Sequence, residues 1–312
     1  MFSGGTDMNH RTLGRTGLKV SEIGFGGISV GRAGWGVQGS GDRSEVDEAE
    51  AIRTMHRALD LGINFFDTAP NYGDRESERV FGKALKGHRD RCFIATKCGH
   101  FFSAEKNFVK DHTPALSAQS IDDSLKTLGI ETIDLIQIHS APLEVIQRGD
   151  VLEVLKRAQA AGKVRFIGAT TDDANDAEVC RAALADGGYD ALQVTYNVLH
   201  RVLATEGVLE EAARKGVGII VKSPLGTGAF TYKYASLPEA RKAEQARIAR
   251  LEGLTGGGTV AQLALRYILS NPHVSTIIAG TRRVAHVEEN AKTGDGKGLP
   301  GAKVKQVEEA VH

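Results

Sequence analysis

Cysteine is scarce in this sequence, which argues against the classes of protein that depend on it. The three cysteines are Cys92, Cys98 and Cys180. An odd and sparse set does not build a disulfide framework, and it is typical of a reducing compartment. No grouping of these cysteines with histidines has the spacing of a structural zinc site. We therefore expect a cytoplasmic protein that binds no metal.

A net charge and a long apolar run are also missing. The 39 basic and 39 acidic side chains cancel, whereas a broad nucleic-acid-binding surface usually leaves a basic excess. No stretch approaches the ~18 apolar residues that a membrane-spanning helix needs. Residues 1–10 lack the apolar core of a signal peptide. We therefore expect neither nucleic acid nor a membrane as a partner.

Short apolar runs recur along the whole chain. Runs of this length without internal alternation are typical of strands that are buried on both faces of a parallel sheet. The runs that we predict to be strands are Val20–Phe25, Ile63–Phe66, Cys92–Thr96, Ile133–Ile138, Val164–Ala169, Ala191–Val194, Gly218–Val221 and Ser275–Ala279.

The segments between these runs have apolar residues at intervals of three and four, which predicts helices. The pattern is clear in Glu50–Leu61, which Gly62 ends, and in Val260–Leu269. Strand followed by helix, eight times, is an α/β pattern that favours a (β/α)8 TIM barrel. We expect one domain over residues 11–312 after a flexible lead-in of residues 1–10. Residues 99–116 interrupt the pattern, and we expect a loop over the barrel mouth.

A doubly wound open sheet is the competing fold. It is disfavoured because no GxGxxG turn follows the first predicted strand. In a barrel, functional residues stand at the carboxyl ends of the strands. Asp67, Lys97 and His139 end three successive predicted strands, and Tyr72 lies in the loop after Asp67. Each alone has an ordinary explanation, such as a turn cap or a packed ring, but their convergence on one mouth favours a catalytic set.

The chemistry of this set suits proton transfer to a carbonyl oxygen. A phenol has a pKa of about 10, and a nearby ammonium lowers that pKa because it favours the phenolate. A carboxylate beside the lysine keeps the lysine charged, and a histidine can orient a substrate oxygen. No side chain donates hydride, so a nicotinamide or a flavin must be bound.

Seven segments follow one another along the chain, and they are RTLGRTGLKVSEIGFGG, GINFFDTAPNYG with SERVFGKAL, SLKTLGIETIDLIQIH, GKVRFIGAT, QVTYN, KSPLG and IIAGTRRVAHVEEN. In these segments, and in their order, the sequence resembles the aldo-keto reductase family over about residues 11–290. The first matching segment is similar to the family's opening β-hairpin, so the resemblance implies a TIM barrel with an N-terminal β-hairpin. It also implies an NADP-dependent oxidoreductase, a carbonyl reductase or alcohol dehydrogenase.

The resemblance implies a role for each matching residue. Tyr72 would be the general acid-base residue, Lys97 paired with Asp67 would lower its pKa, and His139 would orient the carbonyl or alcohol. An arginine near the ribose 2′-phosphate favours NADP(H) over NAD(H). The residues implied to hold NADP(H) are Thr170, Thr171 and Gln193 at the nicotinamide, Lys222, Ser223 and Leu225 at the phosphates, and Gly280, Thr281, Arg282, Arg283, Glu289 and Asn290 at the adenosine end.

The substrate is expected to be a small carbonyl compound or alcohol of unknown identity. Trp35, Phe101 and Phe102 are the aromatic candidates to line its pocket. Two other functions stay open. Lys97 could form a Schiff base, as in a lyase or an aldolase, or the protein could bind its nucleotide to sense or gate a partner, with weak redox turnover. A monomer is the default expectation.

Overall fold

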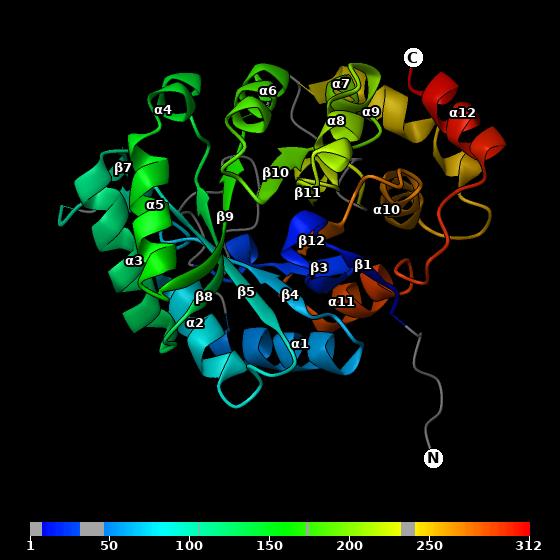
Figure 1. The fold of residues 1–312 in the computed structure, drawn as a ribbon. Coiled ribbons are helices and arrows are strands. Elements are labelled where there is room, and N and C mark those ends of the chain that lie inside the picture. The colour runs from blue at the N-terminus through cyan, green and yellow to red at the C-terminus, as the bar shows by residue number, and fades with distance from the viewer. Residues whose placement is uncertain (1–7, 32–46, 106, 173–174, 232–240) are drawn as a thin grey trace.

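The computed structural model describes residues 8–31, 47–105, 107–172, 175–231 and 241–312. Eight parallel strands close into a barrel that helices surround, which confirms the predicted (β/α)8 TIM barrel (Figure 1). The strands, in their order around the barrel, are β10 (Ala191–Thr195), β11 (Gly218–Lys222), β12 (Thr276–Gly280), β3 (Ile23–Gly26), β4 (Phe65–Asp67), β5 (Phe93–Cys98), β8 (Ile133–Ile138) and β9 (Val164–Thr170).

The two helices for which the sequence predicts bounds, Glu50–Leu61 and Val260–Leu269, begin and end within two residues of those bounds. The predicted helix before Gly62 is α1, and Gly62 follows it with a φ of 83°. A capping box starts α10, because the Thr259 hydroxyl accepts from the backbone of Gln262 and the Gln262 side chain accepts in return. The helices are α1 (Glu48–Asp60), α2 (Glu76–Leu85), α3 (Pro114–Leu128), α4 (Leu143–Arg148), α5 (Asp150–Ala160), α6 (Asp176–Asp186), α7 (Val202–Thr205), α8 (Val208–Arg214), α9 (Lys242–Ala249), α10 (Val260–Leu269), α11 (Val284–Ala291) and α12 (Gly301–Ala310).

An antiparallel hairpin closes the amino-terminal end of the barrel. It consists of β1 (His10–Thr12) and β2 (Lys19–Ser21), and the nitrogen of Arg15 in its turn donates to the oxygen of Gly216, just before β11. Apolar side chains of the hairpin pack with side chains from inside the barrel, which gives the barrel a dry floor. The buried residues of this floor are Leu13, Leu18, Val20, Phe65, Ala95, Leu135, Ala191, Ile220 and Ile278.

The start of the domain differs from the prediction in two ways. The apolar run Val20–Phe25 is divided between β2 and β3, because the chain leaves the hairpin at Ser21 and enters the barrel at Ile23. Both halves are buried, so hydrophobicity alone does not reveal the change of sheet. Met8, in the predicted lead-in, is buried in the core. The described fold therefore includes residues 8–10, which precede the predicted boundary at residue 11.

The predicted loop over residues 99–116 is wrong in part. It contains a second antiparallel hairpin, β6 (His100–Phe102) with β7 (Phe108–Lys110), and α3 already begins at Pro114. Three-residue strands are too short for periodicity to indicate them. Gly99 permits the turn into this hairpin, because its φ is 102° and a Cβ atom there would lie 2.4 Å from the His112 ring.

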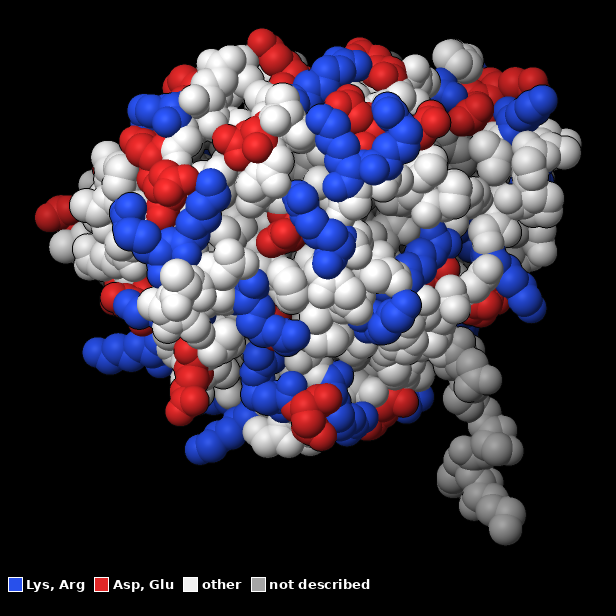
Figure 2. All heavy atoms as spheres, in the orientation of Figure 1, with Lys and Arg blue, Asp and Glu red and all other residues white. Residues whose placement is uncertain are grey.

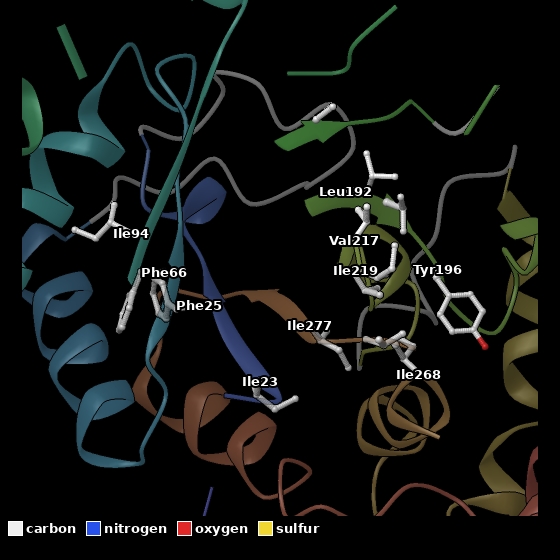
Figure 3. Packing of buried hydrophobic residues seen from close by; sticks show 14 of the residues in the cluster. Ile23, Phe25, Phe66, Ile94, Leu192, Tyr196, Val217, Ile219, Ile268 and Ile277 are labelled. Atoms are coloured by element: carbon white, nitrogen blue, oxygen red, sulfur yellow. The ribbon is translucent and has the colours of Figure 1, made fainter. Parts of the chain in front are cut away.

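The main hydrophobic core lies between the outer face of the strands and the helices. Figure 3 shows Phe25 of β3 beside Phe66 of β4, with ring centroids 5.6 Å apart. It also shows Ile277 of β12 and Ile268 of α10, which belong to the same buried cluster. Each such side chain stabilises the fold by about 1.5–3 kcal/mol relative to an exposed position. This packing holds the strand ends, and the residues that follow them, in fixed positions.

The surface carries both signs of charge. Blue and red side chains are interspersed over the face that Figure 2 shows, in keeping with the balanced total. Many of them form ion pairs, such as Lys163 with Asp122 at 2.6 Å, and exposed pairs of this kind contribute at most about 1 kcal/mol. In the described part of the chain, the helices are too short or too polar to cross a membrane.

Candidate active site

Two of the predicted catalytic residues, Asp67 and Lys97, stand on the inner face of barrel strands, directly above the apolar floor. Successive side chains of a strand point to opposite faces, so Asp67 shares the inner face of β4 with Phe65 of the floor. Each layer inside a TIM barrel is supplied by alternate strands. The strands β4, β8 and β10 are such alternates, and they supply Asp67, Gln137 and Gln193.

One buried carboxylate organises this layer. The Lys97 ammonium donates to Asp67 Oδ1 at 2.5 Å and to the backbone oxygen of Thr68 at 2.8 Å. The other oxygen, Asp67 Oδ2, accepts from Gln137 Nε2 at 3.0 Å and from Gln193 Nε2 at 2.8 Å. Asp67 and Lys97 are each only 1% exposed. A buried ion pair is tolerated when its remaining hydrogen-bonding capacity is also used, and these amides meet that need.

Gln137 is a site residue that the sequence patterns did not predict. Its signal is a single amide in the apolar run of β8, on the same face as Leu135 of the floor. Gln193 is predicted to hold the nicotinamide amide. Its Nε2 donates to Gln137 Oε1 at 3.2 Å as well as to Asp67. Gln193 therefore offers a bound cofactor its Oε1 atom, because its amide hydrogens are already used.

Tyr72 lies over the lysine. The Lys97 nitrogen is 5.0 Å from the centroid of the phenol ring. The turn after β4 fixes this position through backbone hydrogen bonds. The backbone nitrogen of Tyr72 donates to the backbone oxygen of Ala69, and the backbone oxygen of Tyr72 accepts from the backbone nitrogen of Ser77. Gly31 packs against the same turn, where a Cβ atom would lie 2.6 Å from the Tyr72 backbone. A phenol, an ammonium and a carboxylate thus follow one another from the mouth inward.

Two opposing effects determine the pKa of Tyr72. Burial raises the pKa of Tyr72, and the positive charge of Lys97 opposes this effect without overcoming it. Lys97 thus lowers the pKa of Tyr72, as the sequence predicts, but the loss of hydration is the larger effect. Burial would lower the pKa of Lys97, but Asp67 and Tyr72 together raise it. At neutral pH the site holds a neutral phenol above a charged lysine.

His139 contacts the ring of Tyr72. The two rings meet edge to face, with centroids 6.0 Å apart. The backbone after His139 is tied to the end of β9, because the nitrogen of Ser140 donates to the Thr170 hydroxyl at 2.7 Å. Burial lowers the pKa of His139 well below its usual range, and the neighbouring His100 lowers it further. A neutral imidazole can bind a substrate oxygen without adding a charge to the site.

A cleft of about 430 Å³ opens at the carboxyl ends of β11 and β12. Residues at the start of α10 and on α11 also line it. Thr259 and Glu289 meet across it, with the threonine hydroxyl 2.6 Å from the carboxylate. Five of the predicted cofactor residues line this cleft, and they are Leu225, Gly280, Thr281, Glu289 and Asn290.

The other predicted residues lie on β6, at the carboxyl ends of barrel strands or just after those ends, with one exception. Trp35 lies outside the described residues. Phe101 and Phe102 are half-buried on β6. The remaining predicted cofactor residues follow barrel strands directly, with Thr170 and Thr171 at the end of β9, Lys222 and Ser223 at the end of β11, and Arg282 and Arg283 between β12 and α11.

The chemistry of these residues fits a nicotinamide dinucleotide. The Thr171 hydroxyl is buried and finds no hydrogen-bond partner among the described residues. The same holds for the side-chain oxygen of Asn71. These two atoms keep hydrogen-bonding capacity that a bound group or a water molecule can use. An amide such as that of nicotinamide supplies both a donor and an acceptor.

Comparison with known proteins assigns the chain to a class of enzymes. A model of the Aldo/keto reductase family matches residues 22–312, so the chain belongs to that family, as its motifs predict. L-galactose dehydrogenase of Arabidopsis thaliana is 33% identical over 302 residues, which are 91% of this chain and 88% of the relative. NADH-specific methylglyoxal reductase of Escherichia coli (strain K12) is 29% identical over 308 residues, which are 89% of this chain and 91% of the relative.

A solved structure agrees with this assignment. Aldo-keto reductase AKR11C1 from Bacillus halodurans, in its holo form, matches with a TM-score of 0.84 and 27% sequence identity. The match covers 98% of this chain and 97% of that chain. The protein is therefore an oxidoreductase of a family that reduces carbonyl groups with a nicotinamide cofactor.

Proposed function

We propose that the protein is an NADP-dependent carbonyl reductase or alcohol dehydrogenase in which Tyr72 is the general acid-base residue. The observation that carries the proposal is the Tyr72 phenol over the Lys97–Asp67 ion pair, with the neutral His139 beside it. Bound NADPH supplies the hydride. The chain itself has to orient the substrate oxygen and move one proton.

Each side chain has one task in this proton transfer. His139 binds the carbonyl oxygen, and the Tyr72 hydroxyl donates its proton to the same oxygen. The resulting phenolate lies close to the Lys97 ammonium, whose attraction is strong because the surroundings are dry. Asp67 keeps the lysine charged and in place. In the reverse direction the phenolate accepts the proton of the alcohol.

The pH dependence follows from the raised pKa of Tyr72. Because burial holds this pKa above its ordinary value, the phenol keeps its proton through neutral pH. We expect kcat/KM for carbonyl reduction to be level from about pH 6 to 9 and to fall as the pH rises through the Tyr72 pKa. Alcohol oxidation needs the phenolate and should increase over the same alkaline range. A reduction rate that falls between about pH 6 and 8 would contradict Tyr72 as proton donor.

The proposed preference for NADP(H) is supported by two arginines. Arg282 and Arg283 follow the cleft residue Thr281 and precede α11. The backbone oxygen of Arg282 accepts from the Thr54 hydroxyl at 3.1 Å, which anchors this segment to α1. A guanidinium matches the oxygens of a phosphate with paired donors. NADH lacks the 2′-phosphate, so these side chains should give the protein a higher affinity for NADPH than for NADH.

Replacing Arg282 and Arg283 by alanine should weaken NADPH binding and leave NADH binding unchanged. Hydrogen bonds to charged groups contribute about 1.5–3 kcal/mol, so we expect the NADPH Kd to rise about 10- to 100-fold. Protein fluorescence during titration with each cofactor measures this. Arg181→Ala is a matched control, because Arg181 pairs with Glu206 on the surface at 2.9 Å. An equal loss of affinity for both cofactors would argue against a phosphate contact.

The two alternative functions fare differently. A Schiff-base lysine must lose its proton to attack a carbonyl, whereas Lys97 donates to Asp67 and Thr68 and its pKa is raised. Its environment therefore disfavours a lyase. A nucleotide sensor would use the same cleft and would differ only in turnover. The steady-state rate with NADPH and a carbonyl substrate distinguishes a sensor from a reductase.

A further inference from the structure

A second histidine lies flat against His139. The ring of His100, the first residue of β6, stacks on that of His139 with centroids 4.2 Å apart and planes inclined by 25°. His100 is only 3% exposed. Within the part of the chain that the structure describes, His100 Nε2 and His139 Nδ1 have no hydrogen-bond partner. Ring packing, and not a hydrogen bond from either of these nitrogens, therefore holds the two rings together.

The remaining sides of His100 are also covered. His112 lies edge-on at 5.5 Å between centroids, and Phe108 does so at 5.4 Å. His112 Nε2 is 2.8 Å from the backbone oxygen of His139, which ties the hairpin β6–β7 to the end of β8. The Gly99 position brings the chain this close, because any side chain there would collide with His112. The hairpin thus presents one imidazole face to the proposed substrate-orienting residue.

We propose that His100 is a positioning residue of the reaction, whose ring fixes the orientation of the His139 imidazole toward the substrate oxygen. The proposal rests on the proposed role of His139 in carbonyl reduction. The terminal torsion of a histidine is broad and has no sharp preference of its own. Tyr72 meets His139 only at 6.0 Å, so the closer, stacked ring selects the orientation.

The stack also favours uncharged rings. Burial lowers the pKa of His100 to about 3, with His112 acting in the same direction. Burial lowers the pKa of His139 as well, and His100 is its next largest cause. Protonation of either ring would place a charge in a dry stack, which is costly. The other titratable groups that act on the two rings or lie against them are Lys97, Lys110, Asp172, Lys222 and Tyr72.

The first test measures the protonation of the His139 ring directly and does not depend on catalytic turnover. In ¹⁵N-histidine NMR spectra of the wild-type protein, the His139 signals should show no titration near the ordinary histidine pKa, because burial holds the His139 pKa well below it. In His100→Ala, water reaches the ring, and the signals should titrate near the ordinary histidine value of about 6.5. His100→Phe keeps a flat apolar ring and should behave like the wild type. A wild-type His139 that titrates near pH 6.5 would overturn the proposal, even where the alanine variant does not fold.

The second test separates positioning from general loss of structure. His100→Ala should reduce kcat/KM for carbonyl reduction about 10-fold or more, since small misplacements are costly in catalysis, and should add an acid limb to the pH profile. His100→Phe should stay within about 3-fold of the wild type. Phe108→Ala is the matched control, because it removes a ring from His100 on the solvent side and keeps the stack.

The outcomes distinguish this proposal from the proposed function. Unchanged kcat/KM and pH profile in a folded His100→Ala variant would overturn the positioning role. A His100→Phe variant that is as impaired as His100→Ala would also overturn it, because a ring nitrogen and not the stack would then be needed. A wild-type protein that reduces no carbonyl would refute the proposed function, whereas the NMR titration would still test the stack.

Discussion

Tyr72→Phe is expected to reduce turnover with NADPH and a carbonyl substrate by about 10²- to 10⁴-fold, the range that general acid catalysis provides. The substitution removes one oxygen and keeps the ring. The contact with the Lys97 ammonium over the ring face and the edge contact with His139 should persist. We therefore expect the Kd for NADPH and the melting temperature to change little. Stopped-flow and steady-state rates with fluorescence titration measure the two effects.

Tyr189→Phe provides the matched control for this experiment. Tyr189 is buried like Tyr72, precedes β10 at the opposite end of the barrel, and has a hydroxyl without a partner in the described structure. Removal of an unsatisfied buried hydroxyl is neutral or stabilising. Its turnover should stay within about twofold of the wild type. A Tyr72→Phe variant that is as active as Tyr189→Phe would remove Tyr72 from the mechanism.

The catalytic candidates were predictable because of where they stand. Asp67, Lys97 and His139 each follow an apolar run, and the carboxyl ends of barrel strands meet at one mouth. Gln137 was not predictable in this way. A single amide inside an apolar strand gives no indication of its partner, and the partner here comes from a strand 70 residues away in the sequence.

The sign of the Tyr72 pKa shift also required the structure. The residue types indicate which charges lie near the phenol, and they correctly suggest that Lys97 lowers its pKa. They do not indicate how dry the site is, and burial is the larger effect. The role of His100 was hidden for a related reason. The strands of the hairpin β6–β7 have three residues each, so no periodic pattern predicts that His100 turns toward the barrel mouth.

The second large effect concerns the buried pair of Asp67 and Lys97. Asp67→Asn should destabilise the protein by about 3–5 kcal/mol, because it leaves an ammonium buried without its countercharge. Lys97→Met should have a similar effect, because the Asp67 carboxylate would then lose its countercharge and keep only the amide donors of Gln137 and Gln193. In the double variant Asp67→Asn/Lys97→Met, no unpaired charge remains. We expect the double variant to be more stable than either single variant.

Urea denaturation of the four proteins measures this coupling. Lys163→Met is the matched control for the lysine, since its exposed ion pair with Asp122 is screened by water and its loss should shift the unfolding midpoint little. If the destabilisation of the double variant equals the sum for the single variants, Asp67 and Lys97 act independently, and the pair is not the unit that we describe.

Catalytic activity should respond differently from stability in the two single variants and the double variant. Turnover should be lost in both single variants and should not return in the double variant, because the Tyr72 phenolate then has no ammonium beside it. A buried ion pair often contributes little net stability compared with well-packed apolar residues. Recovery of stability without recovery of activity would therefore mean that the pair is kept in the barrel for proton transfer and not for folding.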